Sequence, residues 1–198
     1  MPKPLDRIMH YVGQHGIVRP RDIEGIGLPR EYLLRLHRQG KVVRSGRGLY
    51  SLPSATITER HSYAEVGRRV PGGVFCLLSA LAFHEITTQS PASVWLALPQ
   101  GARRPAIITP SLKIVRLSGP SLTKGIEKHK VEGVPIRVYS VAKTVADCFK
   151  FRNKIGLDIA IEALKDSLRQ KKATVNEIHH YAMVCRVSKV IRPYMEAL

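Results

Sequence analysis

LPREYLLRLHRQGKVVRSGRGLYSL, residues 28–52, is the stretch around which the rest of the chain is organised. Pro29 suits the first turn of a helix, because its missing N–H would find no partner there. At about 100° per residue, Leu33 and Leu36 fall on one side of that helix, which predicts a packed side. Gly40 then supplies the positive φ with which a helix commonly ends.

The opposite side of this helix and the segment after it are basic. Arg35 and Arg38 fall on the outward side, and residues 41–44 and 49–52 predict two strands joined by the glycine-containing link 45–48. A basic helix directly before a hairpin is typical of a winged helix-turn-helix. In that fold the helix enters the major groove, and the wing runs along the phosphates or a minor groove. The alternative is a solvated basic helix beside an ordinary hairpin.

Two further helices are predicted upstream of this stretch. Residues 5–12 carry apolar side chains at helical spacing, and Gly13 and Gly16 end that pattern. Residues 19–24 predict a short second helix with Pro20 in its first turn. Three helices and a wing make a unit that is only marginally able to bury its own core, so we expect it to pack against the residues after position 53.

The composition points to a polyanionic partner. The 198 residues are 44% hydrophobic, which indicates a folded protein, and carry a formal net charge of +17 with a pI of about 10.3. Residues 1–53 hold ten Lys or Arg against four Asp or Glu, and the remainder is basic as well. Charge alone leaves membrane surfaces and RNA open as alternatives to DNA.

The cysteines and the apolar runs bear on the compartment. Cys76, Cys148 and Cys185 are odd in number and lie in apolar or helical settings, which predicts buried thiols in a reducing cytoplasm. The N-terminus lacks the apolar segment of a signal peptide, and the longest apolar run, residues 74–83, is shorter than the ~20 residues of a membrane span. We therefore expect a cytoplasmic protein with no membrane partner.

The second part of the sequence mixes strands and helices. Residues 58–69 predict a connecting helix with Thr58 as its cap, and residues 74–83 predict a buried helix. Strands are predicted over residues 94–98, 112–117, 126–131 and 134–139, and later helices over residues 141–151, 157–169, 174–186 and 187–198. Glu132-Gly133 predicts a hairpin turn, and Pro135 predicts that the start of the strand over residues 134–139 is an edge or a bulge.

These elements predict an α+β fold. An N-terminal winged helix-turn-helix DNA-binding domain over residues 1–53 is expected, with a connecting helix after it in 54–73. A larger domain over residues 74–198 would hold a small, mostly antiparallel sheet bracketed by helices.

No catalytic chemistry is evident in the sequence. A Mg²⁺-dependent nuclease needs an acidic cluster, and a nucleotidyltransferase needs paired carboxylates after a Gly-Ser turn, and neither pattern occurs; nor does a P-loop or a Rossmann fingerprint. We expect no catalytic residue, no metal site and no cofactor. His84 is interpreted as a core histidine bonded to a backbone carbonyl, with a ligand role as the alternative. Lys143 and Asp147 predict an intrahelical ion pair worth a few tenths of a kcal/mol.

The predicted DNA contacts all lie in the N-terminal part. Bidentate arginines read guanine, carboxylates accept from cytosine, and apolar groups touch the thymine methyl. Base edges are expected to be read by Glu31, Leu34, Arg35 and Arg38. Phosphates are expected to be contacted by Arg19, Arg21, Arg30, Lys41, Arg44 and Arg47.

The order of motifs along the chain resembles a known family, the AbiEi antitoxins, which are the regulatory halves of type IV toxin-antitoxin pairs. In the first part the resemblance lies in Gly16-Ile17-Val18, Leu33, Leu36, Gly40 and residues 46–53. In the second part it lies in residues 76–84, 94–99, 133–139, 143–149 and 191–194. The sequence departs from the usual pattern at Lys143, where arginine is more common, and at Cys148, where a larger apolar residue is.

The resemblance implies an antitoxin and autoregulatory repressor. Such a protein binds inverted repeats of double-stranded DNA in its own promoter, as a monomer in solution or a dimer on DNA. It also counteracts a cognate nucleotidyltransferase-like toxin, in many cases without stable contact. The alternative is a stand-alone winged-helix transcription factor with a ligand-binding or dimerisation domain. A nucleic-acid-processing enzyme is a third hypothesis, against which the missing acidic cluster counts.

Overall fold

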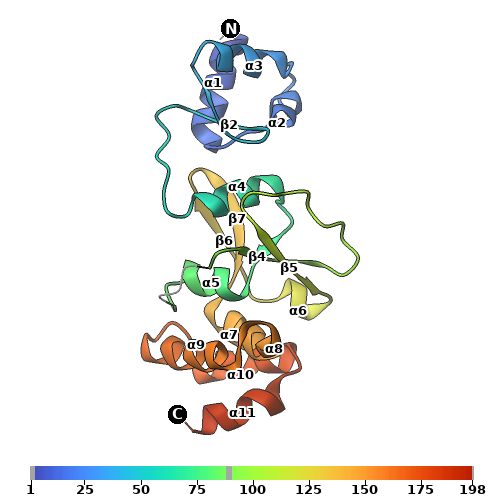
Figure 1. The fold of residues 1–198 in the computed structure, drawn as a ribbon, viewed down its shortest axis with the longest axis vertical. Helices are drawn as coiled ribbons and strands as arrows, with labels where there is room; N and C mark the ends of the chain where they lie inside the picture. Colours follow the sequence, from blue (N-terminus) through green and yellow to red (C-terminus); the bar gives the residue numbers. More distant parts are fainter. Residues whose placement is uncertain (1–2, 88–90, 198) are drawn as a thin grey trace. The chain divides into compact units, whose positions relative to one another are not determined.

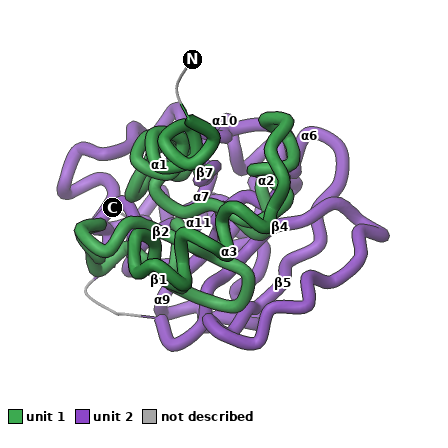
Figure 2. The backbone as a smooth tube through the Cα atoms, turned by 90° about the horizontal axis from the view of Figure 1, so that it is seen from above, with its two compact units in different colours: residues 1–71, 129–136 green, residues 72–128, 137–198 purple. Residues whose placement is uncertain are grey.

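The computed structural model describes residues 3–87 and 91–197, which fall into two compact units (Figures 1 and 2). Unit 1 comprises residues 1–71 together with 129–136, and unit 2 comprises residues 72–128 together with 137–198. The predicted α+β fold is confirmed. The division of the chain at residues 53 and 73 stays a prediction.

Unit 1 begins with three helices and a hairpin. Its elements are α1 (Pro4–His15), α2 (Pro20–Gly25), α3 (Glu31–Arg38), β1 (Val43–Gly46), β2 (Leu49–Ser51) and α4 (His61–Arg69). The apolar sides of the first three helices meet in a small core that contains Ile8, Ile23, Leu33 and Leu36, all fully buried. Gly16 and Gly40 take positive φ values where α1 and α3 end, as the sequence predicts for helix stops. Gly13, however, lies inside α1.

The wing differs slightly from its prediction. The sequence predicts a link over residues 45–48, whereas β1 continues to Gly46, which pairs with Leu49. The turn is therefore only Arg47-Gly48, with Gly48 at a φ of 70°. An irregular register between Arg44 and Gly46 accommodates the extra residue of β1, as a β-bulge does.

Helix α4 begins later than predicted, at His61 instead of Thr58. The reason is a carboxylate from the hairpin tip, which we define as residues 129–136. Glu132 accepts hydrogen bonds from the Thr58 backbone N–H at 2.7 Å and from its hydroxyl at 2.9 Å, and lies 2.7 Å from His61 Nδ1. Burial opposes ionisation of Glu132, but these hydrogen bonds outweigh it and lower its pKa.

Unit 2 contains a sheet and a cluster of helices. Its elements are β3 (Val74–Phe75), α5 (Leu77–Phe83), β4 (Val94–Pro99), β5 (Leu112–Leu117), α6 (Pro120–Thr123), β6 (Ile126–Val131), β7 (Val134–Tyr139), α7 (Val141–Lys150), α8 (Arg152–Ile155), α9 (Leu157–Arg169), α10 (Val175–Val184) and α11 (Ser188–Glu196). The ends of β6 and β7 that form the hairpin tip belong to unit 1. Helix α5 packs on β4 and α7, and α7 in turn packs on α9, α10 and α11 (Figure 1).

The five-stranded sheet has the order β5-β4-β3-β7-β6. It is mixed, where the sequence predicts a mostly antiparallel sheet, because β4 runs parallel to β5 and β3 runs parallel to β7. The strand that the sequence misses is β3, since residues 74–83 predict one helix. Val74 and Phe75 instead pair with β4, and this tertiary pairing prevails over the helical pattern of the run.

Strand β7 lies between β3 and β6 in the sheet order, but its start, which holds Pro135, is an edge on the β3 side, as the sequence predicts. The register explains why a proline is tolerated there. Glu132-Gly133 forms a two-residue turn, so position 135 faces a non-hydrogen-bonded position of β6. On the other side, β3 pairs with β7 only at Val138. The missing N–H of Pro135 therefore costs no ladder hydrogen bond.

Helix α7 carries an ion pair that the sequence underestimates. Ser140 caps the helix as predicted, but Lys143 and Asp147 are 0% and 1% exposed instead of lying on the surface. The Lys143 ammonium bonds to Asp147 and lies 4.2 Å from the centre of the Tyr139 ring. The Cys185 thiol donates to the other carboxylate oxygen of Asp147 at 3.3 Å. Burial raises the pKa of Asp147 despite the adjacent ammonium.

Candidate nucleic-acid interface

The candidate interface is built on α3, whose two sides differ in chemistry. Leu33 and Leu36 are fully buried and fix the helix on the core of unit 1. Arg35 and Arg38, on the opposite side, are exposed, and Leu34 beside them is 37% exposed. An eight-residue helix spans about 12 Å, which is close to the width of the major groove.

The wing adds basic side chains directly after α3. Lys41, Arg44 and Arg47 are exposed, and Arg47 lies in the two-residue turn. Arg44 Nε donates to the Gly46 carbonyl at 3.3 Å, which holds that side chain along the wing. His37 ties the wing to α3, because its Nδ1 lies 3.1 Å from the Val42 carbonyl oxygen.

The start of α3 holds a loose acidic and basic group. Arg30 Nε lies 3.4 Å from a carboxylate oxygen of Glu31 and 3.9 Å from one of Glu24. All three side chains are more than half exposed, and ion pairs of this kind contribute little to stability. A phosphate or a base edge could therefore replace either partner at small cost.

The two predicted DNA contacts at the start of α2, Arg19 and Arg21, differ in their exposure. Arg21 is exposed, but Arg19 is only 17% exposed and pairs with Asp22 at 2.9 Å. Asp22 also lies 2.8 Å from Arg68 of α4, so one carboxylate joins α2 to α4. Burial opposes ionisation of Asp22, but the hydrogen bonds from Arg19 and the charge of Arg68 lower its pKa. Arg19 thus serves the fold of unit 1 and is the predicted contact least available to DNA.

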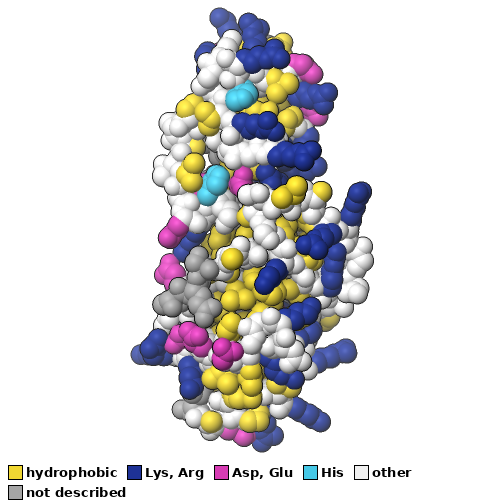
Figure 3. All heavy atoms as spheres, viewed as in Figure 1, with side chains coloured by type: hydrophobic (Ala, Val, Ile, Leu, Met, Phe, Trp, Pro, Cys, Tyr) yellow, Lys and Arg dark blue, Asp and Glu magenta, His cyan; other side chains and the backbone are white. Residues whose placement is uncertain are grey.

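Nine of the ten predicted contacts share one property: they are exposed on α2, on α3 and its flanks, or on the wing. Figure 3 shows Lys and Arg side chains, in dark blue, on the part of unit 1 at the top of the view. The arrangement places cations where a DNA backbone would provide phosphates, around a helix with arginines facing outward. Contact between these residues and DNA stays a prediction.

The sequence missed the residues that support this surface. Arg68 and Glu132 hold α4 to α2 and to the hairpin tip, yet they lie far along the chain from Asp22 and Thr58. Charged side chains such as these are common on exposed helices and turns, so the sequence does not reveal their partners. The one available signal is Thr58, a capping residue type placed before an amphipathic helix.

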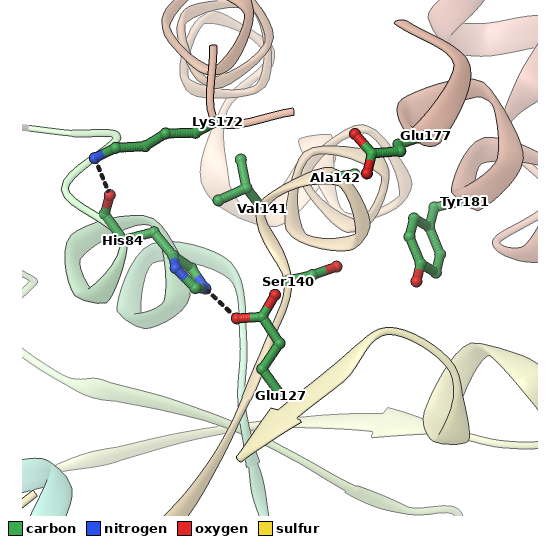
Figure 4. A pocket seen from close by; sticks show the side chains of 8 residues that line it. All are labelled: His84, Glu127, Ser140, Val141, Ala142, Lys172, Glu177 and Tyr181. Atoms are coloured by element: carbon green, nitrogen blue, oxygen red, sulfur yellow. Dashed lines mark hydrogen bonds and ion pairs between the residues drawn. The ribbon is translucent and has the colours of Figure 1, made fainter. Parts of the chain in front are cut away.

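Unit 2 has a cavity of about 470 Å³ between the end of α5, β6 and the starts of α7 and α10 (Figure 4). Its polar groups are largely engaged with the protein. His84 Nε2 lies 2.8 Å from the Tyr139 carbonyl oxygen, which confirms the interpretation of His84 as a core histidine. Lys172 bonds to the His84 carbonyl, and Glu177 is the capping partner of Thr174. Because the positive and negative side chains that line this cavity already have partners within the protein, the lining does not indicate what kind of ligand would bind.

Three other structural findings concern the described residues. Across residues 3–87 and 91–197, no three His, Cys, Asp or Glu side chains are grouped so that they could hold a metal ion. In the same ranges, no helix has the length and apolar character needed to cross a membrane. The cysteines of the sequence are all buried free thiols, as predicted.

Three helices, a turn between the second and third, and a hairpin after the third define the N-terminal region as a winged helix-turn-helix. Residues 6–53 match the family model described as "Transcriptional regulator, AbiEi antitoxin". The N-terminal region is therefore similar to the AbiEi antitoxin family of transcriptional regulators, the family that the sequence resembles.

A solved structure resembles nearly the whole chain. The crystal structure of the RV2827C protein from Mycobacterium tuberculosis superimposes with a TM-score of 0.59 and 12% sequence identity. The match covers 98% of this chain and 78% of that chain. At this identity the likeness shows the fold alone. No curated protein matches the sequence.

Proposed function

We propose that this protein is a sequence-specific repressor of its own toxin-antitoxin operon and an antitoxin without catalytic activity of its own. The observation that carries the proposal is the outward side of α3, where Arg35 and Arg38 are exposed while the wing presents Arg44 and Arg47 beside them. The family description of residues 6–53 as a transcriptional regulator and antitoxin supports both halves of the proposal.

Base reading is assigned to α3 and phosphate binding to the wing. Arg35→Ala or Arg38→Ala is expected to cost about 1–3 kcal/mol on the operator and to relax specificity at one base pair. Arg47→Ala is expected to weaken binding to operator and to random DNA equally. It should also reduce the magnitude of the slope of log affinity against log salt concentration by about one. Fluorescence anisotropy with labelled duplexes at several salt concentrations measures all three variants.

Arg169→Ala is the matched control, since Arg169 is an arginine of unit 2 whose side chain is 75% exposed. It removes the same charge without touching the proposed interface, so its affinity for both duplexes should equal that of the unmodified chain. Equal losses on operator and random DNA for Arg35, Arg38 and Arg47 would contradict the assignment of roles. Footprinting of the upstream region should show protection repeated at about 10 base pairs or a multiple, if two copies bind an inverted repeat.

The antitoxin half of the proposal needs a separate test. The gene adjacent to the operator is expected to encode a nucleotidyltransferase-like toxin, and coexpression of this chain should restore growth to cells that express it. Arg35→Ala should abolish operator repression and keep the rescue, because α3 serves DNA alone in this proposal. If Arg35→Ala loses repression and the adjacent gene encodes no toxin, the results would instead favour a stand-alone winged-helix transcription factor.

A further inference from the structure

A second cavity in unit 2, of about 530 Å³, has a uniform charge. Its walls come from the end of β5, the turn into α6, the end of α7 and the end of α10. Three of the residues that line it are cationic, Arg116, Lys150 and Arg186, and no carboxylate of the described residues lines it. A concave site with one sign of charge concentrates ligands of the opposite sign.

The three cations have few partners within the protein. Arg116 donates one N–H to the Pro99 carbonyl at 3.1 Å, and Lys150 Nζ lies 3.5 Å from the Ser121 hydroxyl. Among the described residues, none of the three cations forms an ion pair. Asp147 lies one turn before Lys150, but it is buried and bonded to Lys143. The residues that line the cavity therefore carry positive charge alone, although the buried Asp147 interacts electrostatically with Lys150.

Arg186 occupies a backbone position that favours glycine. Its φ is 59°, and it ends α10 in a motif in which its own N–H bonds to the Met183 carbonyl at 3.0 Å and the Val187 N–H bonds to the Ala182 carbonyl at 2.8 Å. Glycine is the usual residue at this point of such a helix end, because a side chain there strains the backbone. Arg186 lines the cavity although its backbone position favours glycine, as Lys171 does at the end of α9 without lining this cavity.

The remaining walls suit an apolar group beside the anion. Leu117, Val184 and Met183 line the cavity, and Met183 is 54% exposed. The volume falls within the range of about 300–1,000 Å³ of small-molecule sites. A concave site of this kind fits a small molecule better than the convex backbone of a DNA duplex.

We propose that this cavity binds a phosphorylated small molecule, with Arg116, Lys150 and Arg186 contacting the phosphoryl groups and the apolar wall contacting the rest of the ligand. Arginine and lysine are the side chains that recognise phosphate most strongly. This site is separate from the proposed DNA interface and does not depend on it.

Calorimetric titration of the full chain with four probes tests the proposal: ATP, inorganic pyrophosphate, inorganic phosphate and adenosine. We expect ATP to bind most tightly and adenosine not to bind. Equal binding of ATP and pyrophosphate would overturn the proposed contact between the apolar wall and the ligand, because pyrophosphate has no apolar group. If adenosine bound as well as ATP, or if none of the probes bound, the proposal would be wrong.

Arg186→Gly is the decisive variant, and Lys171→Gly is its matched control. Lys171 is also an exposed cation with positive φ at the end of a helix, but it does not line this cavity. Both changes remove one charge and relax the same backbone strain, so neither should lower Tm. Only Arg186→Gly should weaken ATP binding, by about tenfold or more, as expected for a lost charged hydrogen bond.

Two results would overturn the proposal. If Arg186→Gly and Lys171→Gly weakened ATP binding equally, the probe would be responding to net charge or to the basic surface of unit 1. If Arg186→Gly reduced affinity for duplex DNA while Lys171→Gly did not, the cavity would contact a nucleic-acid backbone instead of a small molecule.

Discussion

Asp22 and Glu132 of unit 1 and Asp147 of unit 2 lie in opposite environments. In unit 1, Asp22 and Glu132 lie at the margin of a small core, and hydrogen bonds hold their pKa values below the ordinary range. In unit 2, Asp147 lies inside a large apolar core, and burial raises its pKa although Lys143 is bonded to it. A unit with little apolar surface to bury gains from polar links between its elements, whereas a large core makes an ion pair costly to interrupt.

The largest effect should come from breaking the buried pair. Asp147→Asn leaves the Lys143 ammonium buried without a counter-charge, so unit 2 should lose about 3–5 kcal/mol of stability. Trp95, the one tryptophan of the sequence, is buried in that core and reports its unfolding in urea by fluorescence. Asp158→Asn, an exposed carboxylate on α9, is the control and should change little. A loss of stability below about 1 kcal/mol would show that burial does not make this ion pair costly to interrupt.

A smaller effect is expected within unit 1, where the end of α1 meets the hairpin tip. A Cβ on Gly16 would overlap the Glu132 carbonyl, and Gly16 also has a φ of 65°. Gly40→Ala is the matched control, because its φ is 70° and nothing lies within 4 Å of the added carbon. Gly40→Ala should cost about 1 kcal/mol from backbone strain, and Gly16→Ala about 1–3 kcal/mol more from the overlap.

Thermal unfolding measured by far-UV circular dichroism and by Trp95 fluorescence compares both glycine variants. Gly16→Ala should shift to lower temperature only the part of the helical signal that α1–α4 contribute, and should leave the transition of the Trp95 fluorescence unchanged, because the overlap lies in unit 1. If Gly16→Ala and Gly40→Ala lowered the stability equally, the hairpin tip would have moved to accommodate the added carbon and would not support α1.

The smallest effect is expected from acid, because Asp22 and Glu132 are only partly buried. The lowered pKa values of Asp22 and Glu132 mean that their stabilisation is complete above the unfolded pKa of about 4 and is lost as pH falls through the folded pKa. Asp147, with a raised pKa, gives no such loss in acid. As the pH is lowered, the part of the helical circular dichroism signal that comes from unit 1 should therefore fall at a higher pH than that at which the Trp95 fluorescence changes. Asp22→Asn should reduce this difference in pH. Simultaneous loss of both signals would refute the contrast between the units.

Local patterns were sufficient for much of the interface. The periodicity of α3, the glycine stop at Gly40 and the basic outer side can be deduced from the sequence, because helix geometry fixes which side chains share a face. The turn of the wing was misplaced by two residues, since Gly46 and Gly48 both suit a turn. Only the pairing of Gly46 with Leu49 decides between them.

The sequence alone determined the helices with caps and amphipathic faces, the hairpins with glycine turns and the excess of positive charge, because each depends on neighbours within a few residues. The tertiary structure decided the rest. It made β3 a strand, buried the ion pair of α7, joined Asp22 to Arg68 and brought three cations from separate elements to one cavity. Most of these outcomes depend on a partner far along the chain, whose proximity no local pattern encodes.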